Sequence, residues 1–99
     1  MSNVLHVNPE DNVVNALEPL SPGQTVRIDD TRVTVRSPIP VGHKMAIVKI
    51  PRGHPIIKYG QTIGLATRDI ESGEHVHVHN VKDPVANWKA QHPLPQEAS

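Results

Sequence analysis

A seven-residue turn pattern occurs four times in this chain: an apolar residue, two residues, glycine, two residues and a second apolar residue. The copies are centred on Gly23, Gly42, Gly53 and Gly73. Glycine tolerates the positive φ of a sharp reversal, and prolines in or beside three copies restrict φ further. Because the flanking apolar residues enter and leave a shared core, the pattern predicts short segments folded around tight turns.

The residues between these turns favour strands. Val and Ile together far outnumber Leu, and branching at Cβ suits a pleated sheet better than a helix. The 10 prolines and 6 glycines divide the 99 residues into short segments, and so short a chain does not form two independent cores. We expect one mainly β domain with strands at residues 25–28, 32–36, 45–50, 55–58, 63–66 and 75–81.

One short helix is expected near the N-terminus, over residues 10–17. Asp11 or Asn8 can cap its free amide groups, and Val13, Val14 and Leu17 fall on one helical face.

After Asn80 the apolar pattern fades. The expected domain therefore covers residues 1–81, and residues 82–99 form a tail or linker whose strong anchor is Trp88. No long apolar run and no basic N-terminal segment occur, so we expect a cytoplasmic protein.

The charge and cysteine counts exclude several classes of site. Lys plus Arg is 10 and Asp plus Glu is 10, so there is no basic excess to predict nucleic-acid or membrane binding. Without cysteine, disulfides, iron–sulfur clusters and thiolate zinc sites are excluded. The 7 histidines are the feature that departs from an average composition, and any metal must be held by imidazole and oxygen ligands.

Three histidines alternate with valines near the end of the domain. On an extended strand, His75, His77 and His79 share one face with Cα atoms roughly 6–7 Å apart, so two imidazoles can reach one metal ion. Such ligands suit Zn²⁺, Fe²⁺, Mn²⁺ or Ni²⁺, with Glu74 or a partner's group completing the shell. An ordinary amphipathic strand with solvated histidines fits the same spacing equally well.

Two further groups of polar residues adjoin turn glycines, where a rigid frame can present functional side chains. They are the pair His43 and Lys44 and the pair Lys58 and Tyr59. Taken singly, each lysine also fits a solvated surface charge, and Tyr59 fits a packing residue. The remaining histidines are expected on the surface without a role: His6, His54 and His92.

Five motifs follow one another in a specific order along residues 5–81. They are Asp11-Asn12-Val13, Gly42-His43-Lys44-Met45-Ala46, Ile57-Lys58-Tyr59-Gly60, Ile63-Gly64 and Gly73-Glu74-His75-Val76-His77-Val78-His79-Asn80. This ordered set resembles the small SAF-type domain of the altronate and galactarate dehydratase family. The small subunit of sulfolactate sulfo-lyase looks similar in the same motifs.

The resemblance implies a β-clip fold of short, bent strands and a role in a lyase. Members of the family join this domain to a much larger catalytic domain or subunit, so we expect a small subunit, or a piece cut at the linker, that is inactive alone. The implied reaction is β-elimination of water from a 2-hydroxy acid such as altronate or galactarate, giving a 2-keto-3-deoxy acid. The implied cofactor is a divalent metal, Fe²⁺ or Mn²⁺ before Zn²⁺, held in the complex with the large subunit.

The residue types match the needs of this reaction. Lysines can bind a carboxylate or sulfonate, histidines can hold a metal or transfer protons, a tyrosine can donate a hydrogen bond and an asparagine can orient a hydroxyl. The candidate catalytic residues are His43, Lys44, Lys58 and Tyr59; the candidate substrate-binding residues are Lys44, Lys58 and Asn80; the candidate metal ligands are His75, His77 and His79.

Other readings of the sequence stay open. The domain also fits a non-catalytic binding or assembly module that docks on a larger protein, or a free-standing histidine metal binder. An exposed Val-rich strand edge can pair with a second copy of the chain. The choice among hexonates, aldarates and sulfolactate depends on contacts that a partner supplies.

Overall fold

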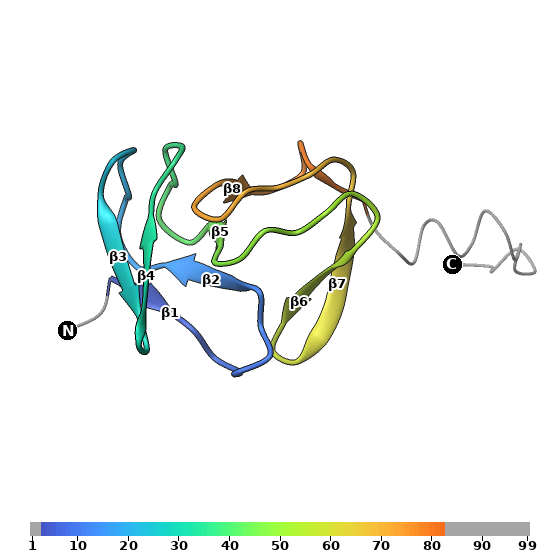
Figure 1. The fold of residues 1–99 in the computed structure, drawn as a ribbon, viewed down its shortest axis with the longest axis horizontal. Helices are drawn as coiled ribbons and strands as arrows, with labels where there is room; N and C mark the ends of the chain where they lie inside the picture. Colours follow the sequence, from blue (N-terminus) through green and yellow to red (C-terminus); the bar gives the residue numbers. More distant parts are fainter. Residues whose placement is uncertain (1–2, 83–99) are drawn as a thin grey trace, which may run out of the picture.

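The computed structural model describes residues 3–82, which form nine short strands. These are β1 (Val4–Leu5), β2 (Val13–Ala16), β3 (Thr25–Ile28), β4 (Thr31–Thr34), β5 (Lys44–Ala46), β6 (Pro55–Lys58), β7 (Gln61–Ala66), β8 (His75–Val76) and β9 (Val81–Lys82). They pair antiparallel in three sheets, ordered β1-β2-β5-β8, β3-β4 and β6-β7-β9 (Figure 1). The predicted mainly β class is confirmed. Residues 3–82 contain no helix long and apolar enough to cross a membrane.

The helix predicted over residues 10–17 is wrong, because the chain there forms strand β2. Val13 and Val14 are each 1% exposed and point to opposite sides of the strand, into two different cores. A helix would turn both valines toward one side, whereas the alternation of a strand buries both. Asp11 and Asn8 consequently do not cap a helix.

The four predicted turns are confirmed, and they share one geometry. In each copy the N–H after the glycine donates to the carbonyl three residues earlier, and the glycine φ lies between 82° and 92°. A positive φ at the third residue is the requirement of a type II turn. The first apolar residues of the turns pair with each other as isolated bridges, Leu20 with Ile39 and Ile50 with Ile70.

The turns divide the domain into two similar halves. In each half, two bridged turns flank a hairpin, β3-β4 in the first and β6-β7 in the second, and Figure 1 shows these hairpins at opposite ends of the domain. Each half has its own apolar core. The central strands serve both cores: Val14 and Met45 enter the first, while Val13 and Ala46 enter the second.

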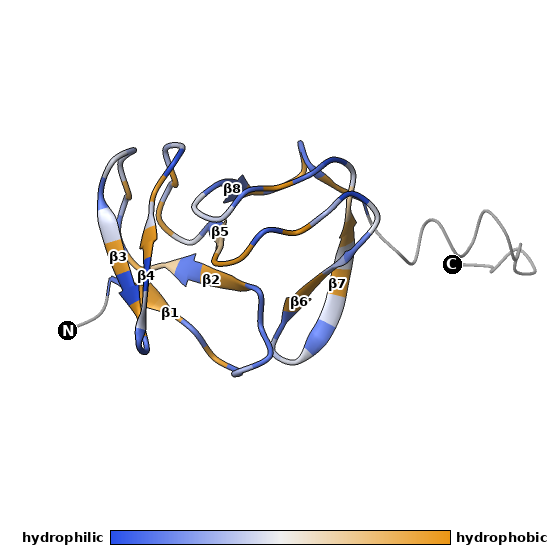
Figure 2. Ribbon diagram, in the orientation of Figure 1, coloured by the Kyte–Doolittle hydropathy of each residue, from blue (hydrophilic) through white to orange (hydrophobic). Residues whose placement is uncertain are grey.

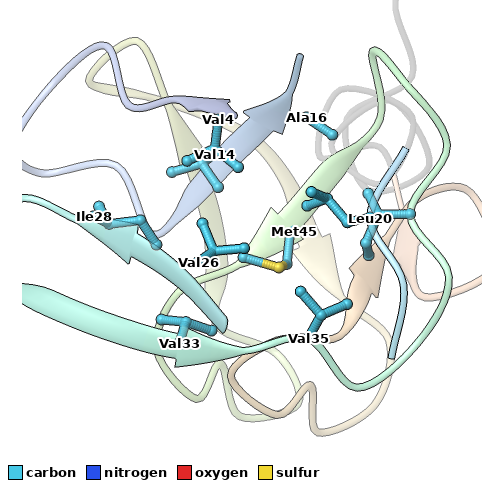
Figure 3. Close-up of a cluster of buried hydrophobic side chains, with 10 residues drawn as sticks. Val4, Val14, Ala16, Leu20, Val26, Ile28, Val33, Val35 and Met45 are labelled. Atoms are coloured by element: carbon cyan, nitrogen blue, oxygen red, sulfur yellow. The ribbon is translucent and has the colours of Figure 1, made fainter. Parts of the chain in front are cut away.

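The distribution of apolar residues follows this plan. Figure 2 shows hydrophobic segments along β2 and within the hairpin strands, and hydrophilic residues at several of the connecting turns. Figure 3 shows the first core, where the Met45 side chain lies among Val26, Val33 and Val35. Met45 and Ala46 are completely buried, so the segment directly after His43 and Lys44 is anchored in the interior.

Three predicted strands are shorter than expected. The strand expected over residues 32–36 ends at Thr34. The strand expected over residues 45–50 ends at Ala46, and the strand expected over 75–81 is interrupted by a turn between β8 and β9. The predicted tail lies outside the described residues except for Lys82 of β9, which pairs with Leu65 of β7. Its predicted anchor, Trp88, also lies outside them.

Candidate functional site

The pairing of β5 with β8 brings two histidines face to face. Lys44 pairs with Val76 and Met45 with His75, so extending this register by one pair places His43 opposite His77. The His43 and His77 rings stack with centroids 4.2 Å apart and planes 24° apart. Residues predicted to act separately, one catalytic and one metal-binding, therefore belong to one cluster.

His75 completes a group of three converging imidazoles. His43 Nδ1 and His75 Nε2 lie 2.8 Å apart, so the two rings share a hydrogen bond. One ring nitrogen from each of His43, His75 and His77 lies within 4.8 Å of the others. Because metal–imidazole bonds measure about 2.0–2.1 Å, two nitrogens on one ion lie at most about 4 Å apart, so these three side chains would have to move slightly to surround one ion. We call them the histidine trio.

Of the predicted metal ligands, His75 and His77 belong to the trio and His79 lies outside it, whereas His43, predicted as a catalytic residue, belongs to it. The His79 side chain is exposed, and its ring stands 5.2 Å from that of His75. Glu74, considered as a further ligand, is engaged elsewhere: its carboxylate accepts a hydrogen bond from the Glu71 N–H and lies 3.7 Å from Arg68.

Asn80 shapes the loop that carries these histidines. Its side-chain Oδ1 accepts from the His77 N–H at 3.0 Å, and its Nδ2 donates to the His75 carbonyl at 2.8 Å. Because the side chain takes up backbone groups that a continuing strand would use, β8 ends at Val76. Asn80, which was predicted to bind substrate, is completely buried, and both ends of its side-chain amide hydrogen-bond the backbone that carries His75 and His77.

The turn before His43 leaves that side chain available. In two of the four turns, the residue after glycine caps the first N–H of the turn: Gln24 bonds Ser21, and Glu74 bonds Glu71. The turn before His43 starts with Pro40, which has no N–H to cap. The imidazole at this position is therefore not needed within its own turn.

Burial and neighbouring charges lower the proton affinity of two imidazoles of the trio, those of His75 and His77. Burial, reinforced by His43, His79, His77 and Lys44, lowers the pKa of His75 to about 4. Desolvation, followed by the charges of His43, Lys44 and His79, also lowers the pKa of His77. These two imidazoles are therefore unprotonated at neutral pH, which is the form that binds metal.

Lys44 connects the histidine trio to the second predicted group. Burial and then the charge of Lys58 lower the pKa of Lys44, so the two lysines lie close enough to repel each other. The Lys58 ammonium stands 4.7 Å over the Tyr59 ring at the tip of the β6-β7 hairpin. Within residues 3–82, no hydrogen bond or ring contact joins Tyr59 to the histidines.

A hollow formed by other described residues lies elsewhere on the domain. It measures about 810 Å³ and is bordered by β1, β3 and the contact between His6 and Asp29. None of the predicted site residues lines it. The side chains of the histidine trio and of Lys44 and Lys58 are partly buried. The hollow is lined by other polar groups, among them His6, Arg27 and Asp29, which the sequence did not single out for chemistry.

Comparison with known proteins identifies the family of this chain. A family model described as the altronate/galactarate dehydratase SAF domain matches residues 2–84. The chain belongs to this family. The matched range of the SAF domain includes every predicted site residue, and the family expected from the ordered motifs is confirmed.

Two relatives of this SAF domain are altronate dehydratases. The chain is 42% identical over 78 residues to the protein from Escherichia coli (strain K12) and 38% identical over 82 residues to that from Bacillus subtilis (strain 168). These matches cover 79% and 83% of this chain but 16% of each dehydratase. The chain thus spans about one sixth of the length of these relatives.

A third relative of the SAF domain is shorter. Over 53 residues the chain is 45% identical to (2R)-sulfolactate sulfo-lyase subunit alpha from Paracoccus pantotrophus. That match covers 54% of this chain and 79% of the subunit.

Three residues have structural roles around the site that were not predicted from the sequence. The Ser37 hydroxyl accepts a hydrogen bond from the His75 N–H at 2.8 Å. Asp11 and Asn12 bond the backbone of the β6-β7 hairpin more than 40 residues away. The Asp11-Asn12 pair was a visible motif, but its partner segment becomes apparent only in the folded chain.

Proposed function

We propose that this SAF domain is the small part of a metal-dependent hydro-lyase. In this proposal it acts with a large catalytic subunit or domain to remove water from an altronate-like or galactarate-like acid, giving a 2-keto-3-deoxy acid. The observation that supports it is the convergence of His43, His75 and His77 beside the partly buried Lys44. The names of the two dehydratase relatives support the same class of substrate.

The histidine trio fits a divalent metal. An ion held by these three nitrogens would have further coordination positions for a carboxylate or hydroxyl of the substrate and for groups of a partner. Imidazole ligands suit Fe²⁺, Mn²⁺ and Zn²⁺, and Fe²⁺ or Mn²⁺ is our first choice. When bound, the ion would supply a Lewis acid that stabilises negative charge on the substrate.

The lysines fit the charge that develops in this elimination. Removal of the proton α to the carboxylate produces an enolate-like dianion, which nearby cations stabilise. Lys44 and Lys58 provide two ammonium groups for that carboxylate. Because its pKa is lowered, Lys44 is a stronger acid than an exposed lysine, which suits donation of a proton to the departing hydroxyl. His79, exposed beside the trio, is placed to exchange protons with solvent.

Co-purification tests the proposal. The tagged chain is isolated with its partner from its native source, and formation of 2-keto acid from altronate and from galactarate is measured for the chain alone and for the complex. We expect no turnover by the chain alone and turnover by the complex that His43→Ala abolishes. His54→Ala is the matched control, because His54 also follows a turn glycine but is exposed. Turnover by the isolated chain, or a complex inactive on both acids, would contradict the proposal.

A second candidate function is the small subunit of a sulfolactate sulfo-lyase. The observation that favours it is the match to 79% of the length of the alpha subunit, which is a short chain like this one. The two lysines can bind a sulfonate as well as a carboxylate. Release of sulfite from sulfolactate by the same purified complex, without turnover of altronate or galactarate, would decide for this candidate.

A further inference from the structure

Tyr59 holds an unusual backbone conformation at the tip of the β6-β7 hairpin. Its φ is 55°, in the left-handed region that bulky side chains rarely adopt. The matching position of the β3-β4 hairpin is Asp29, with φ 53°. A short polar residue such as Asp tolerates this region far better than Tyr does. The second hairpin therefore keeps a strained tyrosine where the first uses a residue suited to the turn.

The carboxylate of Asp11 stabilises this strained turn. It accepts hydrogen bonds from the Tyr59 N–H at 2.9 Å, the Gly60 N–H at 2.8 Å and the Asn8 N–H at 3.2 Å. Asp11 is 4% exposed, so these bonds take the place of the hydrogen bonds to water that the carboxylate loses on burial. Burial raises the pKa of Asp11, but the three backbone bonds and His6 more than offset this and hold it below its usual value.

Asn12 fastens the strand that leads to the same turn. Its Nδ2 donates to the Pro55 carbonyl at 2.9 Å, and its Oδ1 accepts from the Ile57 N–H at 2.7 Å, beside the irregularity in register between Ile56 and Ile57. The β3-β4 hairpin has no comparable clamp among the described residues, and the Asp29 carboxylate is 79% exposed. The hairpin that carries Lys58 and Tyr59 is thus the one that is held in place.

We propose that Asp11 is a positioning residue, which acts through the Tyr59 and Gly60 backbone to hold Lys58 and Tyr59 beside Lys44. This inference rests on the proposed function in one respect, that the lysines bind a substrate carboxylate. The geometric reason is direct: Lys58 precedes Tyr59 in the chain, and its ammonium stands over the Tyr59 ring. Releasing the turn from left-handed geometry would redirect both side chains.

The first experiment measures position without any reaction. The full chain is labelled for NMR, and the ring-current shift that Tyr59 imposes on the Lys58 side-chain protons is recorded. We expect Asp11→Asn to reduce this shift, because Asn offers one acceptor oxygen and its NH₂ opposes the backbone donors. Asp29→Asn, at the exposed turn of the other hairpin, should leave it unchanged. A folded Asp11→Asn variant with the full ring-current shift would overturn the proposal.

The second experiment measures the consequence for anion binding by the complex of the chain with its partner, with galactarate as the probe. We expect Asp11→Asn to weaken binding by about tenfold, the effect of losing roughly one well-placed charged contact, while Asp29→Asn binds as wild type. Equal weakening by both variants would overturn the proposal. A wild-type complex that does not bind galactarate counts against the proposed function alone, because the ring-current experiment still decides the role of Asp11.

A variant pair keeps the test valid if Asp11→Asn does not fold. Glycine adopts left-handed φ without help, so Tyr59→Gly and Asp11→Asn/Tyr59→Gly should both fold. Lys58 chemical shifts that differ between these two variants support a positioning role for Asp11. Identical Lys58 shifts would show that Asp11 does not direct this side chain.

Discussion

At the scale of single residues, position within the turn decides what a histidine does. His43 and His54 both follow a glycine in a turn that starts with proline, and neither ring is needed to cap its turn. His43 is partly buried and meets His75 and His77 across β5 and β8, whereas His54 is exposed. The same local sequence therefore yields a member of a cluster in one place and a surface side chain in the other.

Substitutions of the individual histidines should weaken metal binding to different extents. We expect His43→Ala, His75→Ala and His77→Ala each to weaken binding of Mn²⁺ or Zn²⁺ at least about tenfold, equivalent to ~1.4 kcal/mol, because each removes one converging ligand. His79→Ala should have a smaller effect, and His54→Ala none. Isothermal titration calorimetry measures all five variants. A larger loss for His79→Ala than for His43→Ala would restore the ligand set expected from alternation.

Acid should destabilise the metal-free protein through His75. The unfolded histidine has a pKa of about 6.5 and the folded one a pKa of about 4, so between these values the unfolded chain binds more protons. Stability that is present above about pH 6.5 is therefore lost as the pH falls toward 4. Urea unfolding with a chelator, from about pH 7 to about pH 4, measures the slope. His75→Gln should flatten it and His54→Gln should not; equal slopes in wild type and His75→Gln would refute this assignment.

At the scale of the elements, the glycine turns have one conformation but two kinds of surroundings. A Cβ added at Gly23, Gly42 or Gly53 meets nothing within 4 Å, whereas at Gly73 it would lie 2.0 Å from the Thr34 carbonyl oxygen. Gly73 also accepts a hydrogen bond from the Arg36 N–H at 2.8 Å. The fourth turn is therefore packed in close contact with the first half of the domain, next to the strand that carries His75.

Alanine substitutions should separate these two requirements. Gly53→Ala faces only the left-handed φ, and we expect it to cost roughly 1–2 kcal/mol. Gly73→Ala adds a collision with backbone that cannot swing away, and we expect roughly 2–5 kcal/mol in total. Chemical denaturation measures both changes in the free energy of unfolding. Equal losses for the two variants would mean that the halves separate easily at Gly73.

At the scale of the whole molecule, two small cores are joined by shared strands. β2 and β5 each send neighbouring residues into different cores, and the histidine trio stands at the end of β5 and on the segment around β8. Neither half can lose its core without releasing a strand that the other half needs. The site consequently depends on the integrity of both halves.

Unfolding should therefore be a single cooperative event. Ile39→Ala in the first core and Ile56→Ala in the second should each cost about 2–5 kcal/mol. Hydrogen exchange on each variant should show amides of both hairpins losing protection to a similar extent. If Ile56→Ala exposed the β6-β7 hairpin while β3 and β4 kept full protection, the halves would be independent.

The sequence by itself determined the features that depend on local chemistry. The glycine–proline turns, the strand class and the residues of the histidine and lysine motifs follow from backbone sterics, side-chain branching and residue type, which act over a few positions. The order of the motifs also predicted the family, because a set of short motifs in one order is specific, whereas each motif alone is not.

The tertiary structure decided what depends on contacts between distant segments. It made β2 a strand, because burial in two cores outweighs a local pattern compatible with a helix. It brought His43 to His75 and His77 and left His79 outside the trio, because the cross-strand register and the Asn80 turn set which rings converge. It also assigned Asp11 to a turn 48 residues away. These outcomes are energies of packing and hydrogen bonding between segments that are far apart in the chain, and no window of sequence contains both partners.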